Sequence, residues 1–391
     1  MTGEPIPEEA YAAALAGLPS VGPGRLGALL AGRSPSAAWE LAGGGASVAG
    51  GALIEDSAIR RACGGPLEVP KIAAAWAEAV AAADPARDWL ALLAAGIGVT
   101  YLGAPGYPAA LAGDVDPPAV LFWLGDLGAL AWRRVTVIGT RACTGLGAEV
   151  ASELGADLGA AGVSVVSGLA VGIDGAAHRG AVRSALAGGA PPIGVVASGL
   201  DVPYPRRHAG LWREVAELGL LLSEAPPRHA PERWRFPARN RILAALGEVV
   251  VVVESHAGGG SLLTVDHALA RGIDVMAVPG SVRNPAAAGP NALLADGGAP
   301  VRSAADVLDR LGLSRERVAP AARVRRKLPA DERRVLDAVD WVPTATSGIV
   351  AGSGLGALEV ARCLHQLEDL GLVRRGPGWW ERRVPPPRAR R

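Results

Sequence analysis

The chain has 391 residues, too many for one ordinary hydrophobic core, so we expect two or three domains. Half of the residues are hydrophobic and a fifth are charged, which excludes a disordered chain, and the formal net charge of +1 does not by itself indicate a polyanionic partner. The apolar runs are far shorter than the ~20 residues that cross a bilayer, and the N-terminus shows no secretory signal, so we expect a cytoplasmic protein without a membrane partner.

Residues 1–65 predict a small domain of short helices. Within it, Gly22-Pro23-Gly24 separates two apolar segments, and two interpretations stay open. The tripeptide is either the turn of a helix-hairpin-helix, whose backbone N–H groups face a phosphate, or an ordinary turn between helices. Residues 66–130 predict an Ala-rich helix and then a Gly- and Pro-rich connector into the core.

The central block, residues 131–312, alternates β-branched runs with amphipathic helical stretches. We expect strands at 135–139, 163–167, 193–197, 220–223, 249–254 and 275–279. Helices are expected between them, for example at 148–159 and 261–271. Continuously apolar strands separated by helices indicate a parallel sheet covered on both faces, so the predicted fold class is α/β with a Rossmann-like core.

The C-terminal block predicts a winged helix. A linker at 313–329 leads into a domain at 330–391, with helices expected at 331–340, 347–351 and 356–370 and two short strands around Gly376-Pro377-Gly378. The last residues form a basic tail that we expect to be disordered. Residues 323–391 hold fourteen Arg and Lys against eight Asp and Glu, so the basic surplus of the chain lies in this region.

Two roles remain open for this last domain. Only Arg362 is clearly cationic on the helix that corresponds to a recognition helix, whereas the wing residues Trp379, Trp380, Arg382 and Arg383 are better placed for phosphate contact. Mediating protein contacts is an equal alternative.

Glycines, hydroxyl side chains and arginines follow several of the predicted strands of the core, at the edge where parallel α/β sheets bind ligands. Glycine lets backbone approach a ligand, N–H groups at helix starts favour anions, and arginine binds phosphate through two parallel hydrogen bonds. We therefore expect a phosphate-bearing ligand. The candidate binding residues are Gly139, Thr140, Arg141, Ser167, Gly168, Tyr204, Arg206, Arg207, Arg239, Asn240, Arg241, Gly260, Ser261 and Thr264.

Some of these candidates also have a purely structural interpretation. Asn240 is either a ligand-facing amide or a helix cap. Ser261 and Thr264 follow a glycine run and open a helix, so they cap it, hold phosphate, or do both.

Aromatic residues, which could stack against a planar ligand, make up only 4% of the chain. Tyr204, Trp234 and Phe236 lie near the arginines, and we expect Phe236 in the core. Binding should then depend mainly on phosphates and fall steeply with salt.

The motifs of dinucleotide and nucleoside-triphosphate sites are missing from the sequence. GTRACTGLG, after the first strand, lacks the GxGxxG pattern, and no GxxxxGK[ST] is present. Asp174 and His178 lie one helical turn apart, but without a second cluster we interpret Asp174 as a cap and His178 as a packed or locally hydrogen-bonded side chain. The three cysteines lack zinc-site spacing. We expect no metal, no cofactor and no catalytic residue.

Four segments together resemble the DNA-processing protein A family, also called DprA or Smf. They are SGLAVGIDGAAH, FPARNR, GGGSLLT and AVPGSVRNPAAAGPNALLADGGA, they occur in the family's order, and the match covers roughly 100–312. The flanks agree as well. Members often carry an N-terminal helical domain similar to a sterile alpha motif and a C-terminal winged helix.

The resemblance implies a non-enzymatic protein that binds and protects single-stranded DNA and hands it to the RecA recombinase in natural transformation or recombination. It also implies a homodimer formed through the Rossmann-like domain. The family's basic pocket corresponds here to Gly139-Thr140-Arg141 and to Arg206 after Tyr204-Pro205, with Arg239 and Arg241 as the next candidates.

This sequence departs modestly from the family pattern. Thr140 stands where serine is frequent, Gly259-Gly260-Ser261 where Ser-Gly-Ser is usual, and Arg207-His208 where an asparagine often follows. None of these changes removes a phosphate-binding group, although each alters individual contacts.

Two other functions are kept as alternatives. One is a Rossmann-type nucleotide phosphoribohydrolase, which resembles PGGxGTxxE proteins and uses the glutamate of that motif for acid–base chemistry. Thr264 stands at that position here, which leaves Glu254 as the only nearby carboxylate. The other alternative is a nucleotide-sensing regulator that uses its winged helix on duplex DNA.

Overall fold

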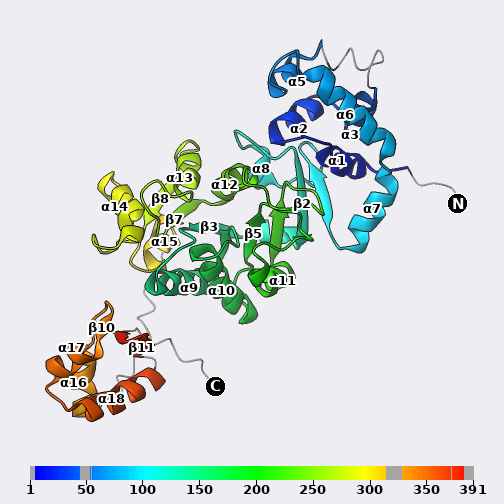
Figure 1. Ribbon diagram of the computed structural model, residues 1–391. Coiled ribbons are helices and arrows are strands. Elements are labelled where there is room, and N and C mark those ends of the chain that lie inside the picture. The colour runs from blue at the N-terminus through cyan, green and yellow to red at the C-terminus, as the bar shows by residue number, and fades with distance from the viewer. Residues whose placement is uncertain (1–4, 45–52, 54, 314–327, 371, 383–391) are drawn as a thin grey trace. The chain divides into compact units, whose positions relative to one another are not determined.

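The computed structural model describes residues 5–44, 53, 55–313, 328–370 and 372–382 (Figure 1). The chain divides into two compact units, Met1–Arg315 and Glu316–Arg391. Most of the predicted linker and the basic tail lie outside the described residues. In the described part of the chain, no helix is long and apolar enough to cross a membrane.

The first unit begins with a group of helices. They are α1 Glu8–Ala16, α2 Pro23–Leu30, α3 Pro35–Gly43, α5 Ser57–Ala62, α6 Val69–Ala82 and α7 Pro85–Ala94. Side-chain caps define several of their starts, because Ser34 accepts a backbone hydrogen bond ahead of α3 and Asp56 accepts two ahead of α5. Helix α2 begins at Pro23, whose missing N–H is not needed in a first turn.

A nine-stranded sheet in the order β1-β2-β6-β5-β4-β3-β7-β8-β9 forms the centre of this unit. Its strands are β1 Gly98–Tyr101, β2 Val120–Gly125, β3 Arg133–Ile138, β4 Val163–Ser167, β5 Ile193–Val196, β6 Leu220–Ser223, β7 Val249–Val252, β8 Asp274–Ala277 and β9 Ala299–Pro300. Strands β3 to β9 pair in parallel, whereas β1 and β2 pair antiparallel at one edge. The predicted Rossmann-like fold class and its six predicted strands are confirmed. The sequence analysis missed three strands of this sheet: β1 and β2, which lie in the segment interpreted as helix and connector, and the two-residue strand β9.

Helices cover both faces of the sheet (Figure 1). Strand β7 shows the alternation, since Val249 and Val251 belong to one core and Val250 and Val252 to the other. The first core includes α9 Gly145–Ala160, α10 Ile173–Leu186 and α15 Ala304–Arg310, and the second includes α8 Ala109–Ala112, α12 Arg235–Leu246 and α13 Leu262–Leu269. The remaining elements are α11 Ala209–Leu218, α14 Ala288–Ala295 and the short turns η1 Leu127–Ala131, η2 Arg206–His208 and η3 Pro285–Ala287.

The N-terminal helices share their core with the antiparallel edge of the sheet. Buried side chains of this shared core include Leu15 on α1, Trp76 on α6, Phe122 on β2 and Trp212 on α11. Figure 1 shows the same helices beside β2. The boundaries expected near residues 65 and 130 therefore do not separate independent cores.

The second unit has its own core and a small sheet. Helices α16 Ala330–Ala338, α17 Thr346–Ser353 and α18 Ala357–Asp369 pack together, and the sheet order is β10-β12-β11, with β10 Thr344–Ala345, β11 Val373–Gly376 and β12 Trp379–Arg382. Three helices followed by a hairpin confirm the predicted winged helix. Strand β10 was missed because two residues carry no periodic pattern.

The shared core predicts that the N-terminal helices and the sheet unfold together. Phe122 is fully buried in that core, so Phe122→Ala should lower the free energy of unfolding by about 3–5 kcal/mol. Equilibrium urea unfolding, followed by circular dichroism, measures this change. Val115→Ala, at a side chain that is 77% exposed, is the control and should change stability by less than about 0.5 kcal/mol. Separate transitions for the helices and the sheet would contradict the shared core.

Candidate nucleic-acid-binding site

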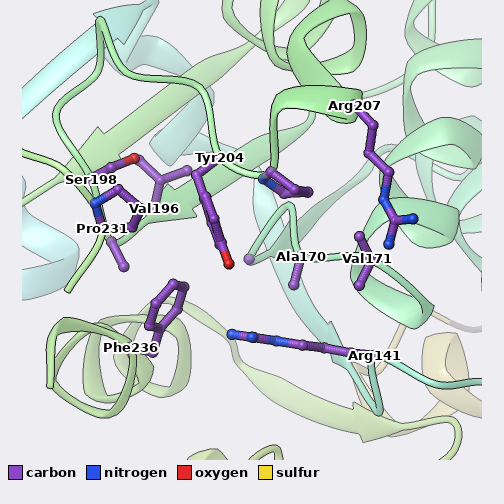
Figure 2. Close-up of a pocket in the computed structure, with 12 residues that line it drawn as sticks. Arg141, Ala170, Val171, Val196, Ser198, Tyr204, Arg207, Pro231 and Phe236 are labelled. Carbon is purple, nitrogen blue, oxygen red and sulfur yellow. The ribbon is translucent and has the colours of Figure 1, made fainter. Parts of the chain in front are cut away.

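A hollow of about 170 Å³ lies at the carboxyl ends of the parallel strands (Figure 2). We call it the carboxyl-edge pocket, and its lining residues are Arg141, Gly168, Ala170, Val171, Val196, Ala197, Ser198, Tyr204, Pro205, Arg207, Pro231 and Phe236. These residues come from the end of β5, from the segments that follow β3, β4, β5 and β6, and from the start of α12. Open parallel sheets bind their ligands at this edge.

Glycines allow the loops around the pocket to approach each other closely. Gly172 has φ +84°, and a Cβ there would overlap the carbonyl oxygens of Thr140 and Arg141. A Cβ on Gly168 would overlap the side chains beneath the pocket. Both positions therefore require glycine, and together they bring the loops after β3 and β4 into contact.

An aromatic wall lines one side of the carboxyl-edge pocket. The rings of Tyr204 and Phe236 lie 5.7 Å apart and are inclined by 56°, and the Arg141 guanidinium lies 4.8 Å from the centre of the Phe236 ring. Figure 2 shows Arg141 extended toward Phe236 below the Tyr204 ring. The expectation that Phe236 belongs to the core was wrong, because its half-buried ring lines the pocket.

Two arginines of the pocket have no carboxylate partner among the described residues. Arg141 and Arg207 are exposed, and no described Asp or Glu lies within salt-bridge distance of either guanidinium. The charge of Arg141 does act on the buried Asp174, but a guanidinium outside a salt bridge keeps its N–H donors for a phosphate. Arg206, the cation singled out from the sequence, is also exposed but does not line the pocket, whereas its neighbour Arg207 does.

Arg239 lies inside the protein, beneath the pocket. The side chain is 7% exposed, and its Nη1 donates hydrogen bonds to the carbonyl oxygens of Gly168, at 3.0 Å, and Val195. Its Nε donates to Asn240 Oδ1 at 3.3 Å. Burial lowers the pKa of Arg239 to about 10, so the group stays charged at neutral pH. The sequence suggested that Arg239 contacts DNA. Its burial and internal hydrogen bonds indicate instead that it supports the loops beneath the pocket.

Arg241 is also buried and paired. It lies 2.5 Å from a Glu224 carboxylate oxygen, donates to the carbonyl oxygen of Asp116 at 2.7 Å, and is 5% exposed. Burial raises the pKa of Glu224, and the charge of Arg241 opposes that rise. This arginine stabilises the loop ahead of β2, and the expectation that it contacts DNA does not fit its position.

A buried carboxyl group and a buried imidazole lie on α10. Asp174 accepts hydrogen bonds from the backbone N–H groups of Gly139 and Gly168, and burial raises its pKa while Arg239 opposes the rise. The Nε2 of His178 donates to the carbonyl oxygen of Ile193 at 3.0 Å. Both side chains therefore have structural roles. Among the described residues no group of three or more His, Cys, Asp or Glu is placed to hold a metal ion.

Three candidate residues at the ends of β3 and β4, Gly139, Thr140 and Ser167, make contacts within the protein that hold neighbouring strands together. Thr140 donates its backbone N–H to the carbonyl oxygen of Glu254 at 2.7 Å, and a Cβ on Gly139 would overlap Ile173. Ser167 is fully buried, and its hydroxyl donates to the carbonyl oxygen of Val137 at 2.6 Å. These residues hold the strand ends and lie behind the pocket surface.

The predicted residues near α13 lie outside the carboxyl-edge pocket. Asn240 does not cap a helix and instead donates to the carbonyl oxygen of Gly260 at 3.3 Å. The Ser261 hydroxyl donates to Ser255 Oγ at 2.9 Å, and Thr264 is 1% exposed. Of all the candidates, only Arg141, Gly168, Tyr204 and Arg207 line the pocket.

Glu254 fills the position where Rossmann enzymes bind a phosphate. Strand β3 lies between β4 and β7, so the crevice of a Rossmann fold falls between the carboxyl ends of β3 and β7. There the Glu254 carboxylate accepts hydrogen bonds from the backbone N–H and hydroxyl of Thr144 at 2.8 and 2.7 Å, and from the Asn284 amide at 3.2 Å. A Cβ on Gly147 would overlap this carboxylate, which therefore occupies the N-terminus of α9.

Sequence reasoning also missed several lining residues. Val196 ends β5, and Ala197 and Ser198 follow it directly, so the rule that ligands bind at the carboxyl ends of strands could have found them. Pro231 carries no chemical signal, because only the path of the chain between β6 and α12 brings it to the pocket.

The wing of the second unit combines tryptophans with arginines. Arg374 lies over Trp379 and Arg375 over Trp380, at 5.6 and 5.8 Å. Arg374 also pairs with Glu381 at 2.6 Å. These contacts are compatible with either role proposed for this domain, and Arg383 lies outside the described residues.

The fold and the pocket define a class of protein, a Rossmann-like α/β core with an arginine-lined carboxyl edge that is joined to a winged helix. Residues 98–312 match the family model described as DNA recombination-mediator protein A, and residues 319–378 match the DprA winged helix domain. The chain therefore belongs to the DNA recombination-mediator protein A (DprA) family, as the resemblance predicted.

Individual relatives agree with this assignment. The chain is 40% identical to the DNA processing protein DprA of Bacillus subtilis over 217 residues, which cover 55% of this chain and 72% of the relative. It is 40% identical to the putative DNA processing protein DprA of Mycobacterium tuberculosis over 270 residues, covering 67% and 68%. The X-ray structure of DprA from Streptococcus pneumoniae superposes with a TM-score of 0.60 at 30% identity, covering 77% of this chain and 96% of that one.

The buried imidazole makes stability depend on pH. Burial lowers the pKa of His178 from 6.5 to about 4, so the folded state binds fewer protons than the unfolded state between these values. Stability conferred by the neutral imidazole is therefore present above pH 6.5 and is lost as the pH falls toward 4, by roughly 3 kcal/mol.

Urea unfolding at a series of pH values measures this dependence. His178→Gln keeps a hydrogen-bond donor and should remove that part of the pH slope, whatever its effect on stability at pH 8. His365→Gln, at a side chain that is 75% exposed, should keep the slope of the wild type. Equal slopes in wild type and His178→Gln would contradict the assignment.

Proposed function

We propose that this protein binds single-stranded DNA in the carboxyl-edge pocket, protects it, and delivers it to the RecA recombinase. The observation that carries the proposal is the position of Arg141 and Arg207, two exposed guanidinium groups without a carboxylate partner among the described residues, beside an aromatic wall. Arginine binds the phosphate, and an aromatic face accepts a base.

The shape of the pocket favours a single strand over a duplex. In a duplex both faces of each base are covered by stacking, so a base reaches the rings of Tyr204 and Phe236 only when it is unstacked. Tyr204 and Phe236 both line the pocket, so an unstacked base that enters it meets their rings.

Delivery to RecA, a homodimer and a cytoplasmic location are further parts of this proposal, and family membership supports them. A protein that loads a recombinase acts where RecA and the chromosome are, which is the cytoplasm.

The position of Glu254 also supports a protein that binds DNA without catalysing a reaction on it. The phosphoribohydrolase alternative needs a carboxyl group that is free for acid–base work. Glu254 is 7% exposed and accepts hydrogen bonds from Thr144 and Asn284, so it does not face the carboxyl-edge pocket as a free acid.

Removing one pocket arginine should weaken DNA binding and its dependence on salt. For both Arg141→Ala and Arg207→Ala, we expect roughly tenfold weaker binding in 0.1 M salt, because a charge-assisted contact is lost. The slope of log K against log salt concentration should fall by about 0.7 for each phosphate contact removed. Fluorescence anisotropy with a labelled single-stranded oligonucleotide at several salt concentrations measures both quantities, with a duplex of the same sequence as competitor.

The matched control for these two variants is Arg183→Ala. Arg183 is exposed and lies near the C-terminal end of α10, so it is remote from the carboxyl edge of the sheet. This substitution removes the same charge and should leave binding within twofold of the wild type. Unchanged affinity in both pocket variants would show that DNA, if bound, binds elsewhere.

The RecA step is tested on single-stranded DNA that is already coated with single-strand-binding protein. The wild type should shorten the lag of the RecA ATPase on this DNA. The double variant Arg141→Ala, Arg207→Ala should restore the lag, because loading requires that the strand be held. Stimulation by the double variant equal to that of the wild type would contradict the coupling between the pocket and RecA loading.

A further inference from the structure

The carboxyl edge of the sheet continues beyond the pocket. A second hollow of about 20 Å³ shares the lining residues Val196 and Ala197 with the carboxyl-edge pocket. Its lining includes Trp234 and Arg235 at the start of α12, and Pro23 of the N-terminal helix α2. The two hollows therefore adjoin, and the start of α12 lies between them.

Trp234 is an exposed ring that its neighbours hold in place. It is 43% exposed, the Arg235 guanidinium lies 4.5 Å from the centre of its ring, and its indole N–H donates to the Glu232 carboxylate. On the side of the N-terminal helices, a Cβ on Gly22 would lie 3.9 Å from the ring. The indole is thus oriented before any ligand arrives, and this lowers the entropy lost on stacking.

The distribution of exposed aromatic side chains singles out this position. In the described part of the first unit, the aromatic rings with large exposure are Trp132, Tyr204 and Trp234, at 43%, 42% and 43%. Tyr204 and Trp234 lie at the carboxyl edge, whereas Trp132 precedes β3 and so lies at the opposite, amino edge. An exposed indole is an apolar surface that a nucleobase can cover.

We propose that Trp234 is a second base-stacking site, which receives the nucleotide next to the one held in the carboxyl-edge pocket. This inference rests on the proposed function and extends it, because it gives the strand a direction along the edge from Phe236 past Trp234 toward Pro23. The Arg235 charge offsets the Glu232 carboxylate beside the ring and favours the approach of a polyanion. The N-terminal helices then form one border of the DNA-binding surface.

The test compares Trp234→Ala with Trp132→Ala, which removes an equally exposed tryptophan at the opposite edge. Fluorescence anisotropy with a labelled single strand long enough to cover both hollows should show roughly tenfold weaker binding for Trp234→Ala and no change for Trp132→Ala. The salt slope should stay that of the wild type, because stacking releases no counterions. Trp234→Phe, which keeps an aromatic face, should recover most of the affinity.

An oligonucleotide with abasic positions separates stacking from a structural effect. On the abasic strand Trp234→Ala and the wild type should bind equally, whereas Arg141→Ala should still bind more weakly. If Trp234→Ala weakens binding to both strands alike, or binds like Trp132→Ala on the normal strand, the stacking site is refuted while the pocket stands. If the wild type binds neither strand, the proposed function itself fails.

Discussion

A single buried guanidinium holds together the loops that form the binding edge. Parallel strands end with carbonyl groups that the sheet no longer satisfies, and a loop-rich edge would be costly without partners for them. Arg239 donates to carbonyl oxygens at the ends of β4 and β5, and through Asn240 it reaches the loop before α13. Burying this charge is tolerated because Asp174 lies nearby and the carbonyl dipoles solvate the guanidinium.

This arrangement divides the arginines of the edge into two groups with different tasks. Arg239 and Arg241 make their hydrogen bonds inside the protein and stiffen the loops, and at 7% and 5% exposure their side chains are buried away from a ligand. Arg141 and Arg207 rest on that framework with their charges directed to solvent. Rigid support for an exposed cation is valuable, because a ligand then loses less binding energy in ordering the site.

Much of the fold could be predicted from the sequence, because continuous β-branched runs between amphipathic helices carry a strong periodic signal. The edge strands β1 and β2 were missed because they lie among Gly and Pro residues and depend on pairing that no local pattern shows, β1 with β2 and β2 with β6. The sequence predicted the location of the site, the carboxyl edge of the sheet, better than it predicted which residues line it. Position after a strand identifies Arg141, but the depth of Arg239 depends on how α12 packs, which no local pattern encodes. Phe236 was assigned to the core instead of the pocket for the same reason, because its position also depends on how α12 packs.

The carboxylate of Glu254 at the N-terminus of α9 closes the central crevice of the sheet to other anions. Many Rossmann folds complete their central crevice with a cofactor drawn from the cell, so their folding follows the supply of that molecule. Here the polypeptide provides the anion itself, and the helix dipole is neutralised as soon as the chain folds. Any other anion would therefore have to displace Glu254 to reach this helix end.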